Sequence, residues 1–180
     1  MDKKTLRKLF QNERDNIEPR MHKMLNFMLM ESLKEVLFEH NIKRLGVYYP
    51  IRGEVDVRAL QEVYELYYPK IEDGRIVFYK DTGEFEEGPM GTFEPKSDET
   101  IDKDDLDAVI VPGLVYDYAL YRLGYGKGFY DDFLRDYKGL SVGVCFERFR
   151  MEALPSREHD IPVDMLVTDN QVYESPHEDV

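Results

Sequence analysis

The chain has 180 residues, and its 37 Asp and Glu against 24 Lys and Arg give a formal net charge of −13. This length fits one domain over residues 1–180, and the 42% of hydrophobic residues is enough to build a sizeable core. An acidic protein repels nucleic acid, so nucleic-acid binding is the least favoured functional class. An anionic ligand would need a local cluster of cations or backbone N–H groups.

Cysteine content and hydropathy indicate the compartment. Cys145 is the only cysteine, which excludes an intrachain disulfide and suits a reducing environment. The first ten residues are charged and lack the apolar core of a signal peptide. The most apolar stretch, residues 24–30, is too short to span a bilayer. These features predict a soluble cytoplasmic protein with no membrane partner.

Two helices are predicted at the start of the chain. Residues 3–14 form a basic, helix-compatible arm. Pro19 then suits the first turn of a second helix, in which apolar residues recur at helical spacing to about Glu39. We interpret this methionine-rich stripe as core packing. Its members are Met21, Met24, Leu25, Met28, Leu29, Leu33, Val36 and Leu37.

The remaining sequence alternates short β-rich segments with helical and glycine-rich ones. Apolar spacing predicts a helix over residues 55–67, composition predicts a long loop over residues 81–103, and a further helix is expected to start in residues 129–137. This alternation predicts a three-layer α/β domain with a mostly parallel sheet flanked by helices. Ligands on such sheets bind at the carboxyl ends of the strands. The predicted strands are residues 44–50, 66–71 and 75–80 (the last two around an Asp73–Gly74 turn), 107–112, 140–146 and 163–168.

The most informative stretch is the glycine loop, residues 122–131, RLGYGKGFYD. Its three alternating glycines let the backbone approach a ligand closely and adopt positive φ. The helix expected after the loop would offer free N–H groups to an anion, and Arg122 and Lys127 add positive charge. The spacing is neither a Walker A nor a Rossmann pattern. An ordinary glycine turn with solvated charges is the alternative, but the surrounding Arg, Lys and Asp favour phosphate binding.

The segment VPGLVYDYALYRLGYGKGFYDDFL resembles the signature of the 5-formyltetrahydrofolate cyclo-ligases, also called methenyltetrahydrofolate synthetases, which reads roughly PG…D…RLGxGxGYYD. Four other segments resemble family motifs in the right order: residues 3–7, residues 48–57 (YYPIRGEVDV), residues 88–95 (GPMGTFEP) and residues 142–168 with LPxxxHDIPVDxxVT. The resemblance implies a Mg-ATP-dependent conversion of 5-formyltetrahydrofolate to 5,10-methenyltetrahydrofolate. The formyl oxygen attacks the γ-phosphate and leaves as phosphate, and N10 closes the ring.

The resemblance also implies roles for the charged residues. Lys127 and Arg122 would act in catalysis by positioning phosphates and neutralising their charge. Asp131 and Asp160 match magnesium positions, and carboxylates suit a hard octahedral cation that bridges phosphates. The implied ATP contacts are Lys3, Arg7, Arg122, Leu123, Gly124, Tyr125, Gly126, Lys127, Gly128, Phe129 and Tyr130.

The folate contacts are implied in the same way. Glu54 matches the family's substrate glutamate and would accept hydrogen bonds from the pterin, and Tyr49 matches a pocket wall. Tyr125 and Phe129 belong to the part of the loop that also faces the folate. Each of these residues, and each carboxylate and cation above, also has a purely structural interpretation. No role is assigned to the histidines, which offer no metal spacing: His22, His40, His159 and His177.

The sequence departs from the family pattern at three places. Leu120 replaces a usual glycine, Phe129 replaces the first tyrosine of the signature, and Arg148–Phe149 stand where a glutamine is common. These changes concern the pterin contacts and leave the ATP and metal positions intact. Two alternatives to the cyclo-ligase remain open: a non-catalytic regulator that binds nucleotide or folate, and an ATP-dependent ligase for a different N-formyl substrate. The expected state is a monomer or a weak homodimer.

Overall fold

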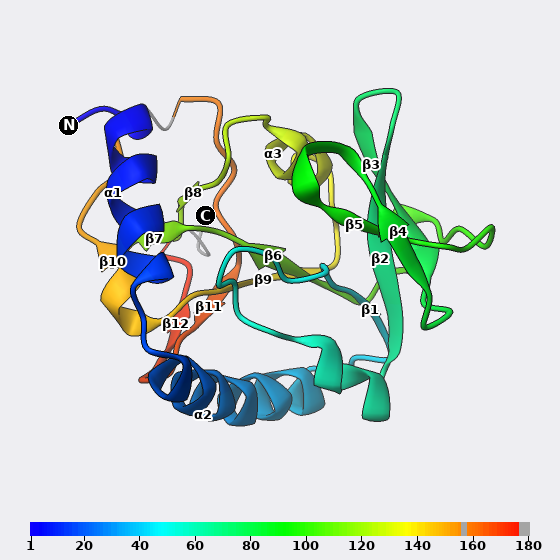
Figure 1. Cartoon of the computed structure of the whole chain (residues 1–180). Helices are drawn as coiled ribbons and strands as arrows, with labels where there is room; N and C mark the ends of the chain where they lie inside the picture. The colour runs from blue at the N-terminus through cyan, green and yellow to red at the C-terminus, as the bar shows by residue number, and fades with distance from the viewer. Residues whose placement is uncertain (156–157, 177–180) are drawn as a thin grey trace.

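The computed structural model describes residues 1–155 and 158–176 (Figure 1). Ser156 and Arg157 of the C-terminal motif, and His177, lie outside the described residues. The α-helices are α1 (Lys3–Asp15), α2 (Pro19–Glu39) and α3 (Phe129–Leu134). Within the described ranges, no helix is both long and apolar enough to cross a bilayer.

The central sheet has the order β12-β11-β9-β6-β1-β2-β3 over the described residues. The five inner strands are parallel, whereas β3 and β12 pair antiparallel at the edges. β6 lies in the middle and is buried along most of its length, as expected for a strand covered on both faces. The strands are β1 (Arg44–Gly46), β2 (Glu65–Glu72), β3 (Arg75–Lys80), β6 (Ala108–Pro112), β9 (Leu140–Val144), β11 (Met165–Val167) and β12 (Val172–Glu174).

Helices lie on both faces of this sheet, which confirms the predicted three-layer α/β architecture. In Figure 1, α2 runs below the sheet and α3 lies above it, next to β3. α2 buries Leu29, Leu33 and Leu37 in the same apolar cluster as the side chains of β6 and β9. The predicted mostly parallel sheet is therefore present, with the strand positions as expected. β3 has the predicted bounds, β2 is slightly longer than predicted, and β1, β6, β9 and β11 are shorter.

α1 stands at the side of the sheet, against a smaller sheet of β10 (Arg150–Met151), β7 (Val115–Asp117) and β8 (Arg122–Leu123) (Figure 1). Leu6 of α1 belongs to a second, smaller apolar cluster that is separate from the main core. Phe10 packs against both clusters. The other members of the second cluster are Leu114, Val115, Leu123 and Leu154.

The helix predicted over residues 55–67 is wrong. This segment contains only the short 3₁₀ helix η1 (Arg58–Glu62), and β2 begins at Glu65. Val55 and Val57 are both buried in a segment without regular secondary structure, so the apolar spacing reflects alternation before η1 rather than one helical face. Parallel pairing of Leu66 with Leu45 then fixes the end of the segment as strand, because tertiary context overrides a weak local preference.

The long loop predicted over residues 81–103 contains an unexpected hairpin. β4 (Phe85–Glu87) and β5 (Phe93–Pro95) pair antiparallel around the one-turn helix η2 (Pro89–Gly91). A second short turn, η3 (Lys103–Asp105), follows. Strands of three residues carry too little alternation to stand out in a segment rich in Gly, Pro and acids. For the same reason β12 was not anticipated.

Three of the eight members of the methionine-rich stripe of α2 are not core, which corrects the prediction. Met21, Met24 and Met28 are 41%, 50% and 44% exposed, whereas the stripe from Leu29 onward is buried. The inner face of the first turns is polar instead. There His22 Nε2 lies 2.9 Å from the Gly53 carbonyl oxygen, and Asn26 exchanges hydrogen bonds with the Asp56 backbone. These polar contacts turn the methionines outward.

Candidate active site

A single cleft brings the predicted site residues together. It lies at the carboxyl ends of β1, β2 and β6, as expected for a parallel sheet, and its empty space is about 1360 Å³ including the part open to solvent. Its walls come from α1, the loop after β1, the tip of the β4–β5 hairpin and the glycine loop. The predicted residues that line it are Lys3, Arg7, Tyr49, Glu54, Arg122, Leu123, Gly124, Tyr125, Gly126, Lys127, Gly128, Phe129, Tyr130, Asp131 and Asp160.

The glycine loop needs glycine for its shape. Gly126 has φ of 92°, and Gly128 has φ of 72° as the N-cap of α3. A Cβ atom on Gly126 would also lie 3.2 Å from Arg7 Nη2. The backbone is therefore close to a cation and in a conformation that other residues rarely adopt, as a loop that cradles an anion requires. The helix expected after the loop is present, but α3 has only six residues.

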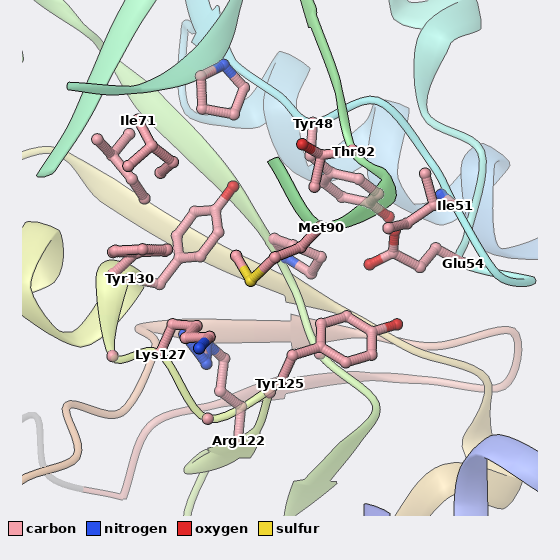
Figure 2. A pocket seen from close by; sticks show the side chains of 18 of the residues that line it. Tyr48, Ile51, Glu54, Ile71, Met90, Thr92, Arg122, Tyr125, Lys127 and Tyr130 are labelled. Atoms are coloured by element: carbon pink, nitrogen blue, oxygen red, sulfur yellow. The ribbon is translucent and has the colours of Figure 1, made fainter. Parts of the chain in front are cut away.

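Arg122 and Lys127 are the two cations of the glycine loop. Figure 2 shows their nitrogen atoms beside one another below the cleft. Arg122 Nε is buried and has no hydrogen-bond partner among the described residues, while its Cζ lies 5.2 Å from the centre of the Tyr130 ring. A buried N–H without an acceptor is unfavourable. Two adjacent cations and an unsatisfied donor therefore fit an anionic ligand such as a phosphate group.

α1 adds two more cations from one face of the helix. Lys3 Nζ lies 2.9 Å from Asp160 Oδ2, and Arg7 Nε donates to the Gly124 carbonyl oxygen at 2.8 Å. Their spacing of four residues places both on the same side of α1. Lys4 and Lys8 are exposed, as expected for the solvated face. The arm is therefore a docked part of the cleft.

The two aspartates predicted as magnesium ligands meet at the same end of the cleft. Asp131 Oδ1 accepts a hydrogen bond from the N–H of Ile161 at 3.0 Å, so it lies next to the segment that carries Asp160. In residues 1–155 and 158–176, no group of three or more His, Cys, Asp or Glu side chains could hold a metal. A cation here would need phosphate or water oxygens as further ligands, a donor set that suits Mg²⁺.

Glu54 lies on the opposite side of the cleft. It is 8% exposed, and its Oε1 accepts a hydrogen bond from the Ile51 N–H at 2.8 Å. Burial raises the pKa of Glu54 to about 7, although that hydrogen bond and the charges of Arg14 and Arg52 oppose the shift. Figure 2 shows the carboxyl group directed toward the cleft. Near neutral pH it is available to accept hydrogen bonds from a ligand.

Aromatic rings form the wall beside Glu54. The Tyr49 ring lies 4.9 Å from both Phe85 and Phe93, centre to centre, and the Arg58 guanidinium lies 4.7 Å from its centre. The β4–β5 hairpin, which was not predicted from the sequence, therefore packs against Tyr49, which was. An aromatic wall near the buried Glu54 carboxyl group suits a heteroaromatic ring that carries N–H donors.

Sequence reasoning missed several residues in and behind the cleft, among them Met90 and Arg14. Met90 has φ of 58° in η2, and Figure 2 shows its thioether projecting between Tyr125 and Tyr130. It lies in the matched segment GPMGTFEP, which was the signal available. Arg14 is 5% exposed, and its helical spacing from Leu6 and Phe10 could have indicated that it faces inward. Further cleft residues that were missed are Tyr48, Ile51, Pro69, Ile71, Ile76, Pro89, Thr92, Phe93, Glu94, Pro112 and Gly113.

The three departures from the family pattern differ in their consequences. Leu120 has φ of 67°, a conformation that favours glycine, yet its side chain is fully buried. Phe129 lines the cleft, as expected. Phe149 is buried in the core against Phe10, at a ring distance of 6.2 Å, and does not line the cleft. Residue 149 therefore lies behind the cleft wall, and its effect on pterin contacts stays a prediction.

Comparison with known proteins agrees with this geometry. The sequence pattern of the 5-formyltetrahydrofolate cyclo-ligase family matches residues 1–169. The chain is 30% identical to the 5-formyltetrahydrofolate cyclo-ligase of Escherichia coli K12 over 160 residues, which cover 81% of this chain and 86% of that protein. Its match to the cyclo-ligase of Saccharomyces cerevisiae is 36% identical but covers only 44% of this chain and 42% of the yeast protein.

A solved structure extends the likeness to the whole fold. The Aquifex aeolicus 5,10-methenyltetrahydrofolate synthetase superposes with a TM-score of 0.87 at 34% identity, covering all of this chain and 96% of the other. Fold, motif order and cleft therefore agree. The chain belongs to the 5-formyltetrahydrofolate cyclo-ligase family.

Proposed function

We propose that this protein uses ATP to convert 5-formyltetrahydrofolate to 5,10-methenyltetrahydrofolate, with release of ADP and phosphate. The observation that carries the proposal is the pairing, in one cleft, of a cationic glycine loop with a buried carboxyl group in an aromatic slot. The named relatives are cyclo-ligases or methenyltetrahydrofolate synthetases, and the cyclo-ligase reaction consumes ATP.

The glycine loop and α1 would hold the triphosphate. Backbone N–H groups of residues 124–128 and the side chains of Arg122 and Lys127 would neutralise its charge, and Arg7 already fixes the loop through the Gly124 carbonyl. Phosphoryl transfer needs positioning and charge neutralisation more than covalent help from the protein. Bound ATP supplies the phosphoryl group that turns the formyl oxygen into a good leaving group.

The Glu54 side would hold the folate. Ionised Glu54 would accept two hydrogen bonds from the aminopyrimidine edge of the pterin, with Tyr49 and Phe129 along its faces. This anchoring would place the formyl oxygen toward Lys127 and the glycine loop. N10 of the folate would then attack the formyl carbon, lose its proton, and displace the oxygen as phosphate.

Magnesium is the finer part of the proposal. Asp131 and Asp160 would hold the cation together with phosphate oxygens, and Lys3 now neutralises Asp160. Asp131→Asn should abolish metal-dependent turnover, and full activity of that variant would exclude this site. A cytoplasmic location, a monomer or weak homodimer, and the absence of nucleic-acid and membrane partners remain predictions from the sequence.

The direct test is to mix purified protein with Mg-ATP and 5-formyltetrahydrofolate and follow the absorbance of the methenyl product, with ATP omitted as the control. ATP-dependent product formation would support the proposed reaction. If folded protein gives no product, a panel of other N-formyl substrates separates a ligase of different specificity from a regulator that binds without turnover.

A further inference from the structure

Arg14, near the end of α1, connects two loops that line opposite sides of the cleft. Its Nε donates to the Arg52 carbonyl oxygen at 2.8 Å, and its Nη2 donates to the Tyr125 hydroxyl at 2.6 Å. Gln11, one turn earlier, accepts from the same Nη2 at 3.3 Å. One buried guanidinium therefore bonds at once to the loop that carries Glu54 and to the glycine loop.

Arg14 contacts the first loop at a turn of left-handed backbone. Arg52 and Gly53 are consecutive residues with φ of 48° and 79°, and they form the turn that presents Glu54. A Cβ atom on Gly53 would lie 3.2 Å from Arg14 Cγ. Arg14 thus packs against this turn as well as bonding to it, and the position of Glu54 depends on both contacts.

Its contact with the glycine loop falls between two glycines. Tyr125 lies between Gly124 and Gly126, and its ring also lies under the Arg52 guanidinium at 5.6 Å. The family signature RLGxGxGYYD leaves position 125 open, and Arg14 lies outside the matched basic motif at residues 3–7. The pair is therefore not explained by the family pattern.

Arg14 acts from behind the cleft. It lines a small cavity together with Tyr48, Gly53 and Glu54, whereas it is absent from the residues that line the large cleft. It would therefore touch neither ligand and would act through Tyr125 and the Glu54 turn.

We propose that Arg14 is a positioning residue that holds the Glu54 loop and the glycine loop in one arrangement, so that nucleotide and formyl folate favour each other's binding. The folate half of this inference rests on the proposed function. A folate that fixes the Glu54 loop would, through Arg14, also restrain the glycine loop, and a nucleotide that fixes the glycine loop would restrain the Glu54 loop. The second ligand would then lose less conformational entropy of its loop on binding. Thermodynamic linkage makes that effect equal in both directions.

The test is the affinity for 5-formyltetrahydrofolate, measured by calorimetry with and without a saturating non-hydrolysable ATP analogue and magnesium. For the wild type we expect the analogue to tighten folate binding about tenfold. Arg14→Met should bring this ratio close to one. Arg14→Lys, which can still reach one partner, should give an intermediate ratio. Lys8→Met removes an exposed cation from the same helix and should leave the ratio unchanged.

The pH dependence of folate binding separates positioning from general stability. Glu54 is faced by Arg14 from α1, Arg52 from its own loop, Tyr48 after β1, Tyr125 from the glycine loop and Tyr130 from α3. Arg14 lowers the pKa of Glu54, so Arg14→Met should move the midpoint of folate affinity to higher pH. Tyr125→Phe keeps the cation and should move it much less.

Three outcomes would overturn the inference. The first is a wild-type ratio of one. The second is an Arg14→Met variant that loses thermal stability but keeps the wild-type ratio and midpoint, since Arg14 would then be merely structural. The third concerns a wild type that binds the ATP analogue but no formyl folate, a result that by itself would refute the proposed function and not the inference. In that case Arg14→Met and Tyr125→Phe should each still weaken the analogue about fivefold if the inference holds, and unchanged affinities would overturn it.

Discussion

On one side of the cleft the glycine loop and α1 present cations and backbone N–H groups, whereas on the other side the buried Glu54 carboxyl group lies near aromatic rings that include those of the β4–β5 hairpin. The first side is suited to an anion and has glycine at the positions where the backbone needs it. The second is suited to a flat ring with a hydrogen-bonding edge, and depends on burial. In a chain of net charge −13, the four Lys and Arg residues that line the cleft among the described residues all belong to the first side: Lys3, Arg7, Arg122 and Lys127. Substitutions on the two sides should therefore affect different ligands.

The largest effect is expected for Lys127→Ala on the phosphate side. The Lys127 side chain is exposed, so the fold should survive, while kcat/KM should fall about 10²- to 10³-fold because charge neutralisation is lost. Folate affinity without nucleotide should change less than twofold. Steady-state kinetics and calorimetry check both parts, with exposed Lys138→Ala as the control. Unchanged turnover would remove the phosphate-loop assignment.

Glu54→Gln tests the other side. Loss of the ionised acceptor should weaken 5-formyltetrahydrofolate binding about 50-fold, about 2 kcal/mol, and leave the ATP analogue within twofold of wild type. Direct titration of each ligand measures this, with Glu62→Gln as an exposed control. Equal weakening of both ligands would mean that Glu54 is structural.

The same variant should be more stable than the wild type at alkaline pH. The native pKa of Glu54 is raised from its ordinary value of 4.5 to about 7, so the native state binds more protons than the unfolded state between these values. The unfolding free energy of the wild type, relative to Glu54→Gln, therefore falls as the pH rises from about 4.5 to about 7, by up to about 3 kcal/mol. Urea unfolding at pH 5 and pH 8 gives the comparison. A difference that does not grow between these pH values contradicts the raised pKa.

A smaller effect is expected for Gly126→Ala. An alanine here would have to keep the φ of 92°, which is strained for any residue with a Cβ atom, and its methyl group would crowd Arg7. Nucleotide affinity should therefore fall about tenfold, about 1.4 kcal/mol, with little change in folate affinity. Gly74→Ala in the β2–β3 turn also has positive φ but meets nothing within 4 Å, and it controls for backbone strain alone. A similar loss of nucleotide affinity in both variants would exclude a local effect on the loop.

The two sides were also unequally visible in the sequence. Gly124, Gly126 and Gly128 mark the phosphate side directly, because positive φ and close approach demand glycine. The Glu54 side depends on a hairpin of two three-residue strands and on the burial of the Glu54 carboxyl group. The local spacing of residue types predicts neither feature. Position 54 was identified through resemblance. Its raised pKa became evident only from its surroundings.

The fold shows the same division. The buried β6 and the turn at Asp73–Gly74 were predictable because one short segment determines each. Residues 55–67 were not, because Leu66 pairs with Leu45, and local apolar spacing carries no information on such distant partners. Arg14 was missed for a related reason. An arginine on a basic helix resembles a solvated residue until the loop that covers it is known.

The way α1 is packed bears on how readily this helix detaches from the rest of the chain. Its buried Leu6 lies in the small apolar cluster, Phe10 packs at the border of that cluster and the main core, and its Lys3–Asp160 ion pair joins residues 157 positions apart. Few apolar contacts and a long loop to close make α1 the segment expected to detach first and to dock last. Ligands that bridge α1 and the glycine loop would then protect the α1 amides from hydrogen exchange far more than those of β6. Occupancy of the cleft would be reported by the helix at its edge.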